Sequence, residues 1–145
     1  MLARVAQDAP VDRTEFERWR SEADRALAGA RLQRDGGLHN WACFEAEQAA
    51  QLALKGLLHG LGRGPWGHDV VRLGDLARDA GIAPPAPLVD ALRRLGRHYI
   101  AARYPDAHAS GPPGPHYGES DATQAIADAE AVLAFVDATW KGLGG

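Results

Sequence analysis

The chain has 145 residues, of which 46% are hydrophobic and 24% are charged, as in ordinary globular proteins. We expect one domain over residues 1–145, with residues 1–11 as a disordered lead-in, because this length can bury a core without metals or disulfides. The formal net charge of −3 excludes a uniformly basic surface for nucleic acid. A single cysteine, Cys43, favours a cytoplasmic location, and no apolar run reaches the roughly 20 residues that span a bilayer.

The first helix is predicted to begin after Asp12 and to run to about Arg34. Asp12 followed by Glu15 resembles a capping box, in which each side chain accepts a hydrogen bond from the other residue's backbone N–H. Asp35-Gly36-Gly37 ends the helix, since glycine commonly follows a helix C-terminus.

The second helix, from Trp41 to about Leu61, is predicted to be the most buried of the chain. It is rich in Ala and Leu and has no Pro. Glu47, Gln51 and Lys55 form a polar ladder at spacings of four residues. Small residues recur at spacings of three and four, a pattern that lets another helix approach closely: Ala42, Ala46, Ala49, Ala53, Gly56 and Gly60.

Three further helices complete the expected fold. A short third helix is predicted to open at His68-Asp69, with Asp69 as its N-cap, and to close at Gly81. The fourth spans about Leu88 to Arg103, and the fifth about Glu119 to Trp140. The fold class is therefore all-α, an up-and-down bundle of about five helices without a sheet.

The fourth and fifth helices have opposite charge. Arginines and no acids occur between residues 91 and 104, whereas acids alone occur between residues 119 and 140. Two interpretations are equally open: the acidic helix lies beside the basic one, or the arginines form a positive ligand-binding surface. Pro105 to Gly118 is predicted to be a surface loop, and loops of this length are often functional or mobile.

Two other motifs are weaker. Residues 62–67 match the glycine pattern of dinucleotide-binding loops, but a helix rather than a strand precedes them and Pro65 interrupts them, so a turn is predicted. None of the six histidines is paired at a metal-binding helical spacing, so we expect neither a metal nor another cofactor. His98, His108 and His116 would meet only through the geometry of the long loop.

Three landmarks together resemble the HEPN family of small prokaryotic helical proteins. The first is the stretch from Glu47 to Lys55, EQAAQLALK, in the second helix. The others are His68-Asp69 at the start of a short helix, and Tyr99 with Arg103-Tyr104-Pro105-Asp106 before an acidic last helix. The resemblance runs from about Phe16 to Trp140. It implies a helical bundle that forms homodimers and is often encoded beside a minimal nucleotidyltransferase.

The resemblance also implies two possible functions. In the first, the protein is a module that binds a nucleotide or its nucleotidyltransferase partner, with five candidate ligand-binding residues: Arg93, Arg97, Tyr104, Asp106 and His68. In the second, it is a metal-independent endoribonuclease toxin in which Arg103 and His108 match the family's nuclease motif and meet their counterparts across a dimer axis. His108 would act as general acid or base and Arg103 would hold the phosphate.

The alternative for Arg103 is a structural residue that caps the fourth helix and pairs with Asp106, and the alternative for His108 is a solvated loop residue. Tyr104 is a remote candidate for modification by the nucleotidyltransferase. Tyr104 and Pro105 depart from the nuclease pattern, which favours the first of the two functions.

Overall fold

The computed structural model describes residues 11–64 and 67–144. The predicted lead-in falls almost entirely outside these residues, as do Pro65 and Trp66 of the glycine-rich turn. The described residues contain no strand, which confirms the all-α prediction. The elements in chain order are α2 (Arg13–Asp35), α3 (His39–Gly60), α4 (Val70–Asp79), α5 (Ala86–Gly96), α6 (His98–Ala101), the 3₁₀ turns η1 (Pro105–Ala107) and η2 (Gly114–His116), and α7 (Glu119–Gly142).

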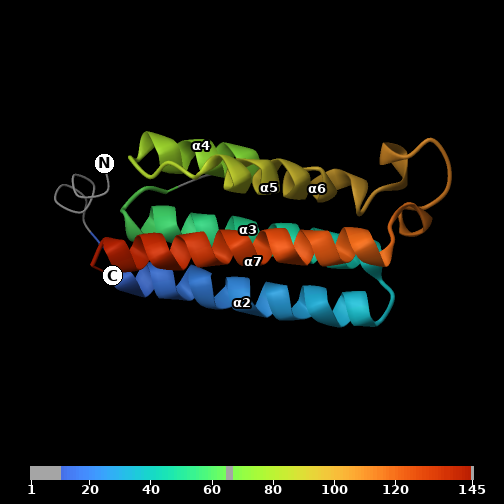
Figure 1. Ribbon diagram of the computed structural model, residues 1–145, viewed down its shortest axis with the longest axis horizontal. Helices are drawn as coiled ribbons and strands as arrows, with labels where there is room; N and C mark the ends of the chain where they lie inside the picture. Colours follow the sequence, from blue (N-terminus) through green and yellow to red (C-terminus); the bar gives the residue numbers. More distant parts are fainter. Residues whose placement is uncertain (1–10, 65–66, 145) are drawn as a thin grey trace.

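The three long helices α2, α3 and α7 pack against one another, with α3 running antiparallel to α2 (Figure 1). Helices α4, α5 and α6 cover the opposite side of α3 and α7, and the loop with η1 and η2 lies at one end of the bundle (Figure 1). Helix α3 contacts all the other α-helices of the described chain, as expected for the most buried helix. No helix in the described ranges is long and apolar enough to cross a membrane.

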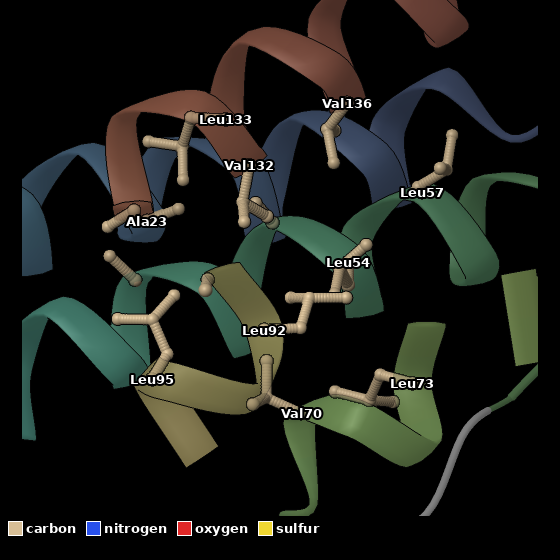
Figure 2. Close-up of a cluster of buried hydrophobic side chains, with 14 of the residues drawn as sticks. Ala23, Leu54, Leu57, Val70, Leu73, Leu92, Leu95, Val132, Leu133 and Val136 are labelled. Carbon is tan, nitrogen blue, oxygen red and sulfur yellow. The ribbon is translucent and has the colours of Figure 1, made fainter. Parts of the chain in front are cut away.

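The core lies where these helices meet around α3. Figure 2 shows Leu54 of α3 between labelled side chains of α7 on one side and those of α5 and α4 on the other. The predicted row of small residues on α3 is buried along its whole length. At its end, a Cβ atom on Gly60 would lie 2.5 Å from Cζ3 of Trp140, so only glycine fits against that ring. Cys43 is fully buried, and burial raises the pKa of its thiol to about 12, so it packs as a neutral side chain.

Two predicted details need correction. The fourth helix is not continuous: a turn at Arg97 divides it into α5 and α6, directly after Gly96, a residue with low helix propensity. The predicted capping box is only half formed. The Asp12 carboxylate accepts a hydrogen bond from the backbone N–H of Glu15 at 3.0 Å, but the Glu15 side chain accepts from Nε1 of Trp19 at 3.2 Å instead of turning back.

Candidate functional site

An open pocket with a volume of about 650 Å³ lies between the start of α4 and the α5–α6 turn. The Asp69 side chain accepts hydrogen bonds from the backbone N–H groups of Val71 and Arg72, which confirms it as the N-cap and fixes this edge of the pocket. The lining residues are His68, Asp69, Val70, Val71, Arg93, Gly96, Arg97, Tyr99 and Ile100. Three of the five predicted ligand-binding residues, those at positions 68, 93 and 97, therefore share one pocket. The other two, Tyr104 and Asp106, do not line it.

The arginines of α5 are divided between two roles. Arg94 donates hydrogen bonds from Nε and Nη2 to the buried carboxylate of Asp128 on α7, both at 2.9 Å. Among the described residues, Arg93 forms an ion pair only with Asp90 of its own helix, at 3.2 Å. No carboxylate of the described residues lies within ion-pair distance of Arg97, which lines the pocket. The first interpretation thus holds for Arg94, which the acidic helix neutralises, whereas a ligand-binding role for Arg93 and Arg97 at the pocket stays a prediction.

The side of the pocket facing α6 is aromatic. The rings of His68 and Tyr99 are stacked, with centroids 5.7 Å apart and planes 12° from parallel. Behind them, the guanidinium of Arg103 lies 4.4 Å from the ring centre of Phe44, 4.5 Å from that of Tyr99 and 4.9 Å from that of Tyr104. Cation–π contacts of this kind are attractive, and they fix the orientation of the guanidinium.

Arg103 caps the end of α6, as the structural alternative proposed, because its Nε donates a hydrogen bond to the carbonyl oxygen of Tyr99 at 2.7 Å. The proposed pairing with Asp106 is wrong: the ion pairs of the described residues include none between the two side chains. The Arg103 guanidinium contacts the three aromatic rings described above instead of the Asp106 carboxylate.

Glu47 lies behind the pocket in surroundings that the sequence did not predict. The ladder it forms with Gln51 is typical of a helix surface, yet the two side chains are 0% and 2% exposed. Nε2 of Gln51 donates hydrogen bonds to Oε2 of Glu47 at 2.6 Å and to the backbone oxygen of His68 at 2.7 Å. Burial raises the pKa of Glu47 to about 7. An acid and an amide four residues apart on an otherwise apolar helix could have indicated this buried pair.

The His108 side chain is not simply solvated, because it makes a hydrogen bond and a ring stack within the protein. Its Nε2 lies 2.6 Å from the carbonyl oxygen of Ala101, and since a carbonyl can only accept, Nε2 carries the proton. The rings of His108 and His116 are stacked, with centroids 4.2 Å apart. The Tyr117 ring contacts both His108 and His98. The loop geometry therefore does gather the three histidines around Tyr117.

These histidines do not form a metal site. Among the residues that the structure describes, no group of three His, Cys, Asp or Glu side chains could hold a metal ion. Arg103 and His108, the predicted catalytic pair, have separate partners. Within the described ranges, neither a hydrogen bond nor an aromatic contact joins them.

Comparisons with known proteins agree with the fold. The TT1696 protein from Thermus thermophilus has a similar crystal structure, with a TM-score of 0.81 and 40% sequence identity over 86% of this chain and 97% of that one. ST0689, an archaeal HEPN homologue, gives a TM-score of 0.73 and 34% identity over 85% of this chain and 95% of its own. An HEPN domain protein of Thermotoga maritima, TM0613, shares the fold at 22% identity, with a TM-score of 0.70 over 86% of this chain and 98% of that one.

A search of curated proteins finds no match. Among protein families, the HEPN domain matches residues 16–139, which is most of the chain. This span begins in α2 and ends in α7, so it includes the pocket, the buried Glu47 and the residues around Arg103. The protein belongs to the HEPN domain family.

Proposed function

We propose that this HEPN-domain protein binds a nucleotide in the pocket between α4 and the α5–α6 turn, as the partner module of a minimal nucleotidyltransferase. The observation that carries the proposal is the convergence of His68, Arg93 and Arg97 on one pocket beside the ring of Tyr99. The volume of about 650 Å³ falls in the usual range for small-molecule sites.

The chemistry of the pocket suits the two parts of a nucleotide. Arginine side chains bind phosphate through charge-assisted hydrogen bonds, and Arg97 has no competing carboxylate among the described residues. Tyr99 and Ile100 offer an apolar surface against which a base can pack. The His68 ring, already stacked on Tyr99, would lie next to both the phosphate and the base.

A binding measurement tests this proposal directly. Calorimetric titration with ATP, ADP and AMP should detect binding to the wild type, and the double variant Arg93→Ala, Arg97→Ala should lose about tenfold or more in affinity, because each arginine–phosphate contact contributes about 1 kcal/mol or more. Arg78→Ala is the matched control, since Arg78 is on α4 outside the pocket and pairs with Asp75. Nucleotide affinity that is equal in the double variant and in the wild type would refute the site.

We further propose that the protein acts as a homodimer. Three large side chains are exposed beside the pocket: Trp41 at 41%, Ile100 at 50% and Tyr104 at 48%. The Trp41 ring contacts that of Phe44, and Phe44 and Tyr104 both contact the guanidinium of Arg103, while Ile100 lines the pocket, so we take them as one apolar patch. Analytical ultracentrifugation should show a dimer that Trp41→Ser with Ile100→Ser dissociates. Val11→Ser, at an exposed apolar residue of the N-terminal segment, is the control.

Endoribonuclease activity is the alternative function, and the separate partners of Arg103 and His108 are the reason we place it second. Nε2 of His108 is bonded to the carbonyl oxygen of Ala101, so proton transfer with RNA would use Nδ1 or require the loss of that hydrogen bond. An assay of purified protein on RNA decides the matter. Cleavage by the wild type that His108→Ala abolishes would establish the alternative.

A further inference from the structure

We propose that Glu47 is a proton-binding group linked to the pocket: its buried carboxylate takes up a proton when an anionic ligand binds. This inference rests on the proposed function, because it needs an anion in the pocket. It assigns a role to a side chain that does not itself line the pocket.

The hydrogen bonds of Gln51 place Glu47 directly behind the pocket wall. The same amide nitrogen, Nε2, contacts Oε2 of Glu47 at 2.6 Å and the backbone oxygen of His68 at 2.7 Å. One amide group therefore separates the carboxylate from a residue that lines the pocket. Glu47 is 0% exposed, so its charge is screened less than that of a surface carboxylate.

The charges around Glu47 leave it without a direct counterion. No Arg or Lys of the described residues reaches it within ion-pair distance. The positive charges that act on it from further away are Arg103, which follows α6, and Lys55 on α3 itself. His68, ahead of α4, is the other titratable group on this side, and its backbone oxygen receives the Gln51 amide. The carboxylate is thus stabilised mainly by neutral amide donors.

Both protonation states fit the surroundings. In the ionised state, Glu47 accepts hydrogen bonds from Gln51 at Oε2 and from Gln48 at Oε1, the latter at 2.9 Å. After protonation, Oε2 still accepts from Gln51. The side chain of Gln48 is only partly buried, so its amide can turn and present its oxygen to the new hydroxyl. The proton can therefore bind without disrupting the wall.

The direction of the coupling follows from the charges. A phosphate or sulfate in the pocket adds negative charge near a buried carboxylate, which makes ionisation of Glu47 more costly. Burial already holds the pKa of Glu47 at about 7, so this further rise falls within the neutral range. By linkage, the anion must then bind more tightly when Glu47 is protonated. Anion affinity should fall as the pH rises through 7.

Inorganic sulfate is the probe, because its charge stays constant across neutral pH. Two proteins are compared by NMR titration from pH 6 to pH 9, one with His68→Gln alone and one with His68→Gln and Glu47→Gln. The first substitution removes the ionisable ring at position 68 from both proteins. If sulfate raises the pKa of Glu47 by about one unit, the affinity of the first protein should fall about tenfold over this range, while that of the second stays level. Glu45→Gln, at the half-buried neighbour on α3, should leave the fall intact.

The outcomes separate this inference from the proposed function. A level sulfate affinity in the Glu47→Gln protein together with a falling one in its parent supports the inference. Sulfate binding with the same pH dependence in both proteins refutes the inference and leaves the pocket as an anion site. Absence of sulfate binding at every pH, confirmed with ADP, refutes the proposed function and the inference with it.

Discussion

Replacing Glu47 by glutamine should change how the stability of the protein depends on pH. The pKa of this buried acid is about 7 in the folded protein, against 4.5 for an ordinary glutamate. Because the folded state holds the proton more tightly, the contribution of Glu47 to the free energy of unfolding is highest below pH 4.5 and falls as the pH rises to 7. At about 1.36 kcal/mol per pKa unit, Glu47 alone should remove about 2 to 3 kcal/mol between pH 5 and pH 8.

Urea denaturation of wild type and Glu47→Gln at pH 5 and pH 8 measures this contribution. The variant cannot ionise at this position, so its free energy of unfolding should fall less between the two pH values, by about 2 to 3 kcal/mol. Comparing each protein with itself cancels any hydrogen bond that glutamine makes or loses. Glu17→Gln, on the exposed face of α2, should follow the wild type. Equal changes in wild type and Glu47→Gln would show that Glu47 is ionised throughout and would refute the assigned pKa.

Two further predictions concern packing and charge. A Cβ on Gly56 would lie 2.9 Å from Cβ of Trp19 and 3.4 Å from the α2 backbone. Gly56→Ala should therefore destabilise the protein by about 1–3 kcal/mol in urea denaturation. Gly29 has open space around it, so Gly29→Ala should stabilise the protein by up to about 1 kcal/mol. A stable Gly56→Ala variant would contradict the close helix crossing. Asp128→Asn should lower the melting temperature more than Asp137→Asn, because the side chain of Asp128 is 5% exposed and that of Asp137 is 52% exposed. Equal decreases in melting temperature would contradict a larger contribution from the buried Asp128.

The helices could be predicted from the sequence because their signals are local. The spacing of small residues, the Asp69 N-cap and the change from basic to acidic segments all operate within a few turns of helix. The third and fifth helices therefore begin within two residues of their predicted starts. The division of the fourth helix at Arg97 was missed. A single glycine is tolerated within many helices, so its presence at position 96 did not indicate a break.

The environment of Glu47 could not be predicted, because it depends on segments far away in the chain. A polar ladder at spacings of four residues normally marks a solvated helix face. In this fold the segment before α4 and the residues around α6 cover that face, and the ladder becomes a buried network that contacts His68. The aromatic surroundings of Arg103 have the same origin, since Phe44 is on α3 and Tyr99 is on α6. The predicted pairing of Arg103 with Asp106 was wrong because it was based only on their closeness in the sequence.

The contacts at the end of α6 explain why a ligand-binding function suits this chain better than the nuclease that its Arg103–His108 spacing implies. Spacing in the sequence brings two residues near each other, but catalysis also needs both side chains to face one substrate. Arg103 is held by rings on α3 and α6, whereas His108 is held by the carbonyl of Ala101 and the ring of His116. A phosphate that contacts both side chains would have to reach the Nη atoms of Arg103 and Nδ1 of His108 at once, and within the described ranges no contact joins the two side chains. Arg93 and Arg97, in contrast, already line one pocket, and among the described residues no carboxylate competes for Arg97.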